Sequence, residues 1–109
     1  MPIEYIGEKK MDIGYEEKFD VLGIVLKDDY EYDHSIEVKP LFIADIDTNN
    51  EIVALELVDV ARGFGVTSQH IKTADIKPYV KCGEFGCRVG VKFKFLNGRE
   101  EEIYGGVFL

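Results

Sequence analysis

The sequence has 109 residues, of which 21 are acidic and 13 are basic, so its net charge is −8. A chain of this length is expected to bury roughly 65% of its unfolded surface, and such a core needs neither disulfides nor metal. The apolar content of 46% excludes a disordered chain, and two cysteines are too few for a secreted disulfide scaffold. We therefore expect a single domain over residues 1–109.

The distribution of charged residues indicates where the protein is located and which kinds of molecule it binds. The start of the chain, "MPIEYIGEKKMDIGYEEK", has charges every few residues and no apolar run typical of a signal peptide or a membrane span. An acidic surface repels phosphate backbones, and the one candidate basic cluster is "KFK" (92–94) with Lys81 and Arg88. We expect a soluble cytoplasmic protein that binds neither membranes nor nucleic acid.

Alternating apolar and polar residues predict strands along most of the chain. Segments with strand character are 19–27, 34–40, 41–47 and 51–60. Pro40 lacks an N–H and is expected at a bend or an edge. A C-terminal β-meander is expected over about 76–109. The prediction is a mainly β fold of about eight short strands, as an antiparallel sheet or small open barrel, with α+β as an alternative class.

One segment departs from the strand period. "VTSQHIKTAD" (66–75) offers Thr67 or Ser68 as an N-cap and places Ile71 and Ala74 at helical spacing. This pattern predicts one short helix around 67–74, preceded by "RGFG" as a loop.

Two registers compete in the last predicted hairpin. Asn97-Gly98 is typical of a two-residue turn, which would set Phe93 opposite Glu102. A three-residue loop from Asn97 to Arg99 sets Phe93 opposite Ile103 instead and matches the apolar faces of the two strands. We predict the longer loop.

The stretch "DIDTNNEIVALE" (45–56) matches a calcium-binding loop at almost every ligand position. Asp45, Asp47 and Asn49 take the first, third and fifth positions, and Glu56 takes the last. An EF-hand loop lies between two helices, however, whereas both flanks here have the period of a strand. A β-hairpin is therefore the competing interpretation.

A two-residue turn at Asn49-Asn50 explains the same residues without metal, because Asn tolerates the positive φ that such a turn requires. One face of this hairpin would carry Phe42, Ala44, Ile46, Val53, Leu55 and Leu57. The solvated face would carry Asp45, Asp47 and Glu56 with Ile43, Ile52 and Ala54. Same-face neighbours on a strand lie about 7 Å apart, which is too far to chelate one ion tightly. We predict an acidic hairpin and no metal ligands.

Cys82 and Cys87 are expected to be direct cross-strand neighbours across the loop "GEFG". Two thiolates supply half of a zinc site, and neither His34 nor His70 is near them in the sequence. A disulfide and a zinc site shared across a dimer stay open, but buried free thiols are the expectation in a reducing cytoplasm.

Catalytic patterns are missing from the sequence. His34 and Ser35 would face opposite sides of a strand, and His70 is expected on the surface of the short helix. The pieces "RGFGV" and "YGGV" lack the lysine and the strand–loop–helix frame of a phosphate site. We predict no catalytic residues, no cofactor and a protein that is not an enzyme.

Two stretches, "MDIGYEEKFDVLGIVL" and "EVKPLFIADIDTNNEIVALELVDVARG", resemble an uncharacterised prokaryotic family, domain of unknown function 2283. The resemblance covers residues 11–62. The corresponding positions are Tyr15, Glu37, Val38, Pro40, Asp45, Asp47, Glu51, Ile52, Val53, Glu56 and Asp59. Gly23 departs from the family's tyrosine, and Val60-Ala61 replaces its Ala-Ser pair. The resemblance implies a small antiparallel β fold without known activity, and a partner-binding role, since some members are encoded beside small toxin-like proteins.

Two hypotheses about function follow. The first is a non-enzymatic interaction module, either a homodimer or the partner of a small basic protein, with an antitoxin-like role in view. It follows from the net charge, the missing catalytic pattern and the apolar end "GGVFL". The second is a small-molecule or metal-binding protein that uses either the acidic hairpin (Asp45, Asp47, Glu56) or the pair Cys82 and Cys87.

Overall fold

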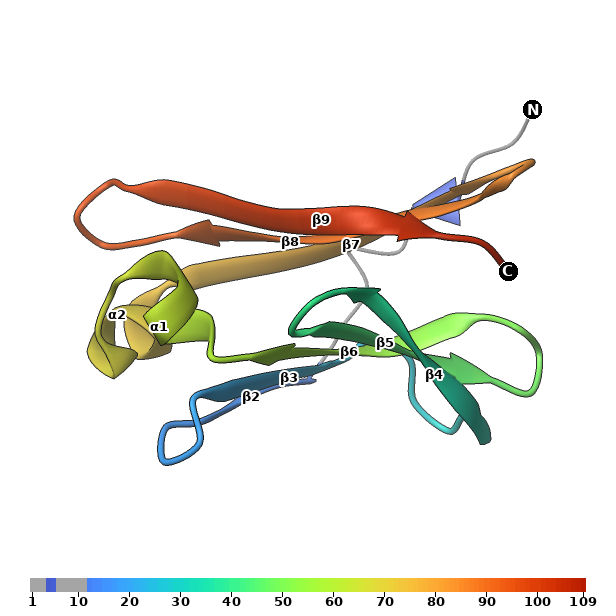
Figure 1. The fold of residues 1–109 in the computed structure, drawn as a ribbon, viewed down its shortest axis with the longest axis horizontal. Coiled ribbons are helices and arrows are strands. Elements are labelled where there is room, and N and C mark those ends of the chain that lie inside the picture. Colours follow the sequence, from blue (N-terminus) through green and yellow to red (C-terminus); the bar gives the residue numbers. More distant parts are fainter. Residues whose placement is uncertain (1–3, 6–11) are drawn as a thin grey trace.

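The computed structural model describes residues 4–5 and 12–109. Two antiparallel sheets lie face to face, and two short helices close one end of the sandwich between them (Figure 1). Half of the N-terminal stretch for which we predict no signal peptide, residues 1–3 and 6–11, lies outside the described residues. Within them, neither helix has the length and apolar content needed to cross a bilayer.

The five-stranded sheet has the order β2-β3-β6-β5-β4. Its strands are β2 (Asp12–Glu16), β3 (Val21–Val25), β4 (Tyr32–Lys39), β5 (Phe42–Asp47) and β6 (Ile52–Val58). After β3 the chain crosses to the far edge of the sheet, and β4, β5 and β6 return by hairpins until β6 pairs with β3. This arrangement is a Greek-key connection. Pro40 lies in the turn between β4 and β5, as predicted.

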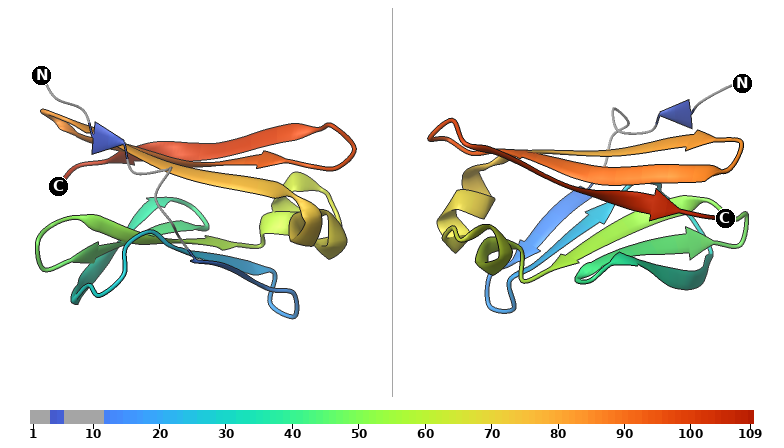
Figure 2. Two further views of the ribbon diagram at one scale, coloured as in Figure 1. Left: turned by 180° about the vertical axis from the view of Figure 1, so that it is seen from behind. Right: turned by 45° about the horizontal axis from the view of Figure 1, so that its top comes forward.

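The second sheet contains the predicted C-terminal meander, drawn above the first sheet in Figure 1 and seen from two further sides in Figure 2. Its strands are β7 (Asp75–Gly83), β8 (Gly86–Lys94) and β9 (Glu100–Val107), and β1 (Glu4–Tyr5) pairs with the far end of β7. The predicted mainly β, antiparallel class is confirmed. The two sheets stay open and do not form a closed barrel.

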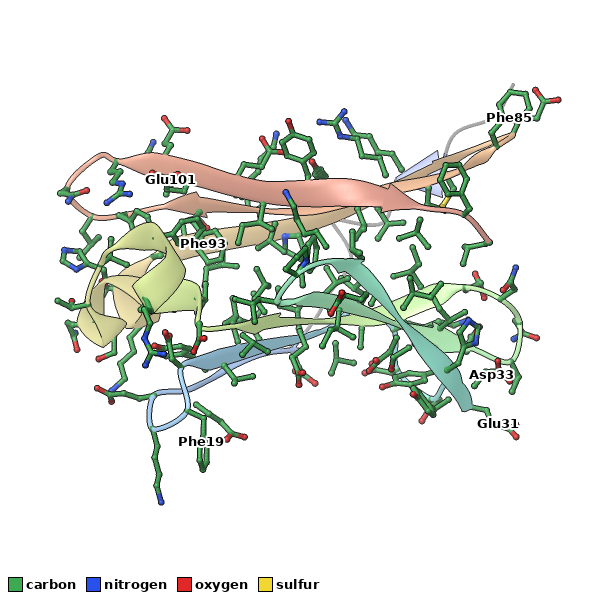
Figure 3. All side chains as sticks on the ribbon, viewed as in Figure 1. Phe19, Glu31, Asp33, Phe85, Phe93 and Glu101 are labelled. Carbon is green, nitrogen blue, oxygen red and sulfur yellow. A yellow bond between two sulfur atoms is a disulfide. The ribbon has the colours of Figure 1, made fainter. Side chains whose placement is uncertain are left out.

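The core lies between the two sheets. Strands of the five-stranded sheet contribute Leu22, Ile24, Phe42, Ala44, Ile46, Leu55 and Leu57, and the second sheet contributes Val80, Val89, Val91, Phe93 and Val107. Phe93, labelled in Figure 3, lies beside the helices and meets Phe64 edge to face, with ring centroids 5.0 Å apart. At one edge the sheets approach closely, since a Cβ on Gly105 would lie 2.5 Å from a methyl carbon of Val38.

The predicted helix is present as α2 (Ser68–Thr73), with Thr67 as its N-cap. The prediction of a single helix is wrong, because α1 (Val60–Phe64) forms where a strand end at 60 and the loop "RGFG" (62–65) were expected. The N-cap residue Asp59 makes no side-chain capping bond. Asp20, from the turn between β2 and β3, takes that role: its carboxylate accepts hydrogen bonds from the N–H groups of Ala61 (2.9 Å) and Arg62 (3.0 Å).

The hairpin between β5 and β6 has a three-residue loop, so the predicted two-residue turn at Asn49-Asn50 is wrong. The N–H of Asp47 donates to the carbonyl of Glu51, and the N–H of Asn50 donates to the carbonyl of Asp47. Only Asn50 has the expected positive φ, at 63°. A β-bulge beside Asp45 also changes which side chains at the start of β6 point into the core. Ile52, rather than the predicted Val53, joins the main core cluster.

The hairpin between β8 and β9 repeats this loop geometry, with Gly98 at the position of positive φ. The predicted loop length is correct, but the loop lies one residue earlier, at 96–98, because the N–H of Phe95 donates to the carbonyl of Arg99. Phe93 therefore pairs with Glu101, two residues from the predicted Ile103. A shift of two leaves every side chain on its predicted face.

Candidate functional site

Asp47 is a buried structural carboxylate. It is 2% exposed, and its Oδ1 accepts hydrogen bonds from the N–H groups of Asn49 (3.0 Å) and Glu51 (2.9 Å). The Lys27 Nζ lies 3.6 Å from its Oδ2. The bond from the Glu51 N–H is the main reason that the pKa of Asp47 is lowered, and it outweighs the opposing effect of burial. The prediction of a solvated Asp47 is therefore wrong.

The other two acidic candidates lie apart from Asp47. Asp45 pairs with Ala54 and accepts a hydrogen bond from the Ser35 hydroxyl at 2.7 Å, whereas Glu56 is exposed one diagonal away on β6. Across residues 12–109, His, Cys, Asp and Glu side chains form no group of three or more that could hold a metal ion. The chain does not bring Asp45, Asp47 and Glu56 together as ligands.

Cys82 and Cys87 are cross-strand partners, as predicted, but they form a disulfide. Their Cα atoms are 4.0 Å apart. The expectation of free buried thiols is therefore wrong, and an oxidised pair offers no thiolate to zinc. The bond joins the ends of the short β7–β8 turn, whose tip carries the exposed Phe85 (Figure 3).

The two histidines serve local structure. His70 lies on α2, and its Nδ1 accepts a hydrogen bond from the Thr67 N–H at 3.2 Å, which completes a reciprocal capping box. His34 lies on the edge strand β4 next to the carboxylate of Asp33, 2.5 Å away. Neither is hydrogen-bonded to a serine or cysteine among the described residues.

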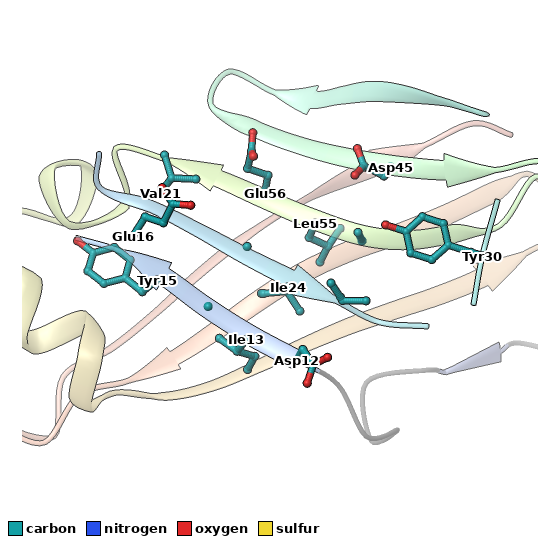
Figure 4. A pocket seen from close by; sticks show the side chains of 14 residues that line it. Asp12, Ile13, Tyr15, Glu16, Val21, Ile24, Tyr30, Asp45, Leu55 and Glu56 are labelled. Carbon is teal, nitrogen blue, oxygen red and sulfur yellow. The ribbon is translucent and has the colours of Figure 1, made fainter. Parts of the chain in front are cut away.

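The outer face of the five-stranded sheet contains a shallow depression with a volume of about 560 Å³. It forms because Gly14 and Gly23 pair directly, so neither strand places a side chain at that point. Val21, Val25 and Ala54 form part of its apolar lining. The carboxylates at its margin are labelled in Figure 4: Asp12, Glu16, Asp45 and Glu56.

Among the described outward strand positions of this sheet, every charged side chain is acidic. Alternation along the paired strands gives the outward positions: Asp12, Gly14, Glu16, Val21, Gly23, Val25, Ser35, Glu37, Ile43, Asp45, Ala54, Glu56 and Val58. Five of these are carboxylates, and none is Lys or Arg. We call this surface the acidic face. The sequence motif at 45–56 contains Asp45 and Glu56, whereas Asp12, Glu16 and Glu37 lie outside it and join them only through the strand order.

One margin of the acidic face is fixed to the helices through the Tyr15 hydroxyl, which donates to Asp20 Oδ1 at 2.6 Å. Burial raises the pKa of Tyr15 well above its ordinary value, and the bond to Asp20 adds to this effect. Burial would also raise the pKa of Asp20, but the bonds from Tyr15, Arg62 and Ala61 outweigh it, so that this pKa is lowered. The carboxylate is therefore ionised at neutral pH and holds α1 against the sheet.

Fold and surface together define a small antiparallel β-sandwich with one acidic, partly apolar sheet face. Comparison of the chain with family models, with curated proteins and with solved structures finds no match. The resemblance of residues 11–62 to family 2283 thus stays a prediction.

Proposed function

We propose that this protein is a non-enzymatic interaction module whose acidic face binds a basic segment of a protein partner. The observation that carries the proposal is the placement of four carboxylates, Asp12, Glu16, Asp45 and Glu56, around an apolar depression on a face whose outward strand positions hold no cation. The antitoxin-like role implied by the family resemblance is one instance of this class, and a homodimer is another.

The chemistry of the depression suits lysine and arginine side chains. Their aliphatic stems can pack on Val21, Val25 and Ala54, while their charged ends reach carboxylates at the margin. The paired glycines leave room for a partner chain to approach the sheet. Charges of one sign on the acidic face also steer a basic partner toward it and speed its association at low ionic strength.

A binding titration with a defined probe tests the proposal. The probe is a short lysine-rich peptide labelled for fluorescence anisotropy, with a glutamate-rich peptide of equal length as a control. We expect the double variant Asp12→Asn with Glu56→Gln to weaken binding about two- to thirtyfold, because exposed ion pairs contribute about 0.2–1 kcal/mol each.

The matched control is Glu31→Gln with Glu84→Gln, which removes the same charge at exposed positions that do not line the depression. It should bind the peptide like the wild type. Equal weakening by both double variants would show that net charge alone attracts the peptide and would contradict a site on the acidic face.

A further inference from the structure

The outer face of the second sheet has the opposite charge, although the chain as a whole carries −8. The strand pairing places Lys77 beside Lys92 and Lys81 beside Arg88. The cations on this face are Lys77, Lys81, Arg88, Lys92 and Lys94, and Lys39 reaches it from β4 over the Tyr104 ring. The carboxylates at the outward positions of β7, β8 and β9 are Asp75, Glu100 and Glu102. We call this surface the basic face.

Two tyrosines hold the basic face in a fixed arrangement. The ring of Tyr79 lies flat on Gly90, where an added Cβ would be 2.5 Å from ring atoms, and its hydroxyl donates to Glu102 at 2.5 Å. The Nζ atom of Lys92 lies 5.6 Å from the Tyr79 ring centroid, and the Arg88 guanidinium lies 4.3 Å from that of Tyr104. These cation–π contacts reduce the entropy that the cations lose when a partner binds.

The acidic and basic faces lie on opposite sides of the sandwich and match in extent. With strands about 4.8 Å apart and about 3.3 Å per residue, each face measures roughly 400 Å² in plan. Both are pleated, antiparallel surfaces without an intervening helix (Figure 2). One copy therefore presents on its two sides surfaces of opposite charge and similar size.

We propose that the basic face of one copy docks on the acidic face of a second copy. This inference rests on the proposed function, because it names the basic partner as another copy of this chain. Front-to-back contact leaves one face of each kind free at the two ends, so association continues beyond a dimer. The contact area is at the low end for specific interfaces, so the association is weak and is screened by salt.

Analytical ultracentrifugation of the full chain tests this contact. The wild type should show a weight-average mass that rises with concentration at low ionic strength and returns to the monomer at high salt. Two double variants should each stay smaller at low salt: Asp12→Asn with Glu56→Gln, and Lys92→Gln with Lys94→Gln. The control Lys18→Gln with Arg62→Gln removes two exposed charges away from the basic face and should associate like the wild type.

Mixing the two double variants gives the decisive readout. Each retains one intact face, and these intact faces are complementary, so the mixture should form a 1:1 complex and stop there. The proposal is overturned if the wild type stays monomeric at low salt. It is also overturned if the mixture of the two double variants forms no 1:1 complex. If the lysine-rich peptide still binds at the acidic face in that case, the proposed function stands and only the identity of the partner is wrong.

Discussion

Replacement of Asp20 by Ala tests whether a turn between two strands holds the helix α1 in place. The carboxylate accepts three hydrogen bonds, from the Tyr15 hydroxyl and from the N–H groups of Ala61 and Arg62. Loss of a capping side chain costs about 0.5–2 kcal/mol, and a bond to a charged group contributes about 1.5–3 kcal/mol. Because such contributions do not add fully, we expect a loss of about 3 kcal/mol in the free energy of unfolding.

A matched control separates these bonds from backbone conformation. Asp20 has a φ of 54°, and Asp29 has a φ of 53° in an exposed loop. Ala disfavours this region at both positions, so Asp29→Ala measures the conformational cost alone. Chemical denaturation of both variants gives the difference. Equal destabilisation by the two variants would refute the role of Asp20 as the cap of α1.

The pH dependence provides a second check on Asp20. Its pKa is lowered in the folded state, so its contribution to stability is complete above the ordinary pKa of an Asp side chain, about 3.9. The contribution is lost as pH falls through the lowered pKa. In the variant Asp20→Asn this contribution is missing at every pH. The stability difference between wild type and Asp20→Asn should therefore shrink in acid, as measured by urea unfolding across that range.

Three further outcomes are expected. Gly90→Ala should destabilise the fold by about 1–3 kcal/mol, because the new Cβ forces the Tyr79 ring off the sheet. The control Gly106→Ala has open space at its Cβ and should cost less than about 1 kcal/mol. Urea unfolding measures both values. Asp47→Ala should lower the thermal midpoint, because two loop N–H groups lose their acceptor; an unchanged midpoint would contradict this. Reduction of the disulfide should cost at most about 2 kcal/mol, because it closes a short loop; a larger loss in denaturant unfolding with reductant would contradict the chain-entropy argument.

Sequence periodicity predicted the β class, the C-terminal meander and the helix at Thr67, because each depends on residues close together in the chain. The helix α1 was missed for the opposite reason. It has five residues and no capping side chain of its own, and Asp20, which caps it, lies 41 residues before Ala61 in the chain. A sequence pattern within the helix and its flanks cannot predict a capping residue that lies in a turn far away in the chain.

The acidic and basic faces were also only partly predictable, because local sequence patterns do not give the order of the strands. Asp45 and Glu56 attracted attention because they fall within one short motif, but the motif misplaced Asp47, whose burial depends on the three-residue loop. The acidic face needs β2 beside β3 and β3 beside β6, and that order does not follow from alternation alone. The basic cluster at "KFK", Lys81 and Arg88 was seen in the sequence. Strand pairing places Lys77 and Tyr104 on the same face as this cluster, and the sequence alone does not show that arrangement.

The Greek-key connection has a consequence for synthesis on the ribosome. While the nascent chain emerges, "VLGIV" of β3 can pair with β2 on one side, but its other edge waits for β6, which ends at Val58. During that interval the apolar side chains of Leu22 and Ile24 are uncovered, since the strands β7, β8 and β9 that later bury them begin at Asp75. This strand is therefore protected only after translation has continued well beyond Val58, and until then its apolar side chains are open to contacts with other chains.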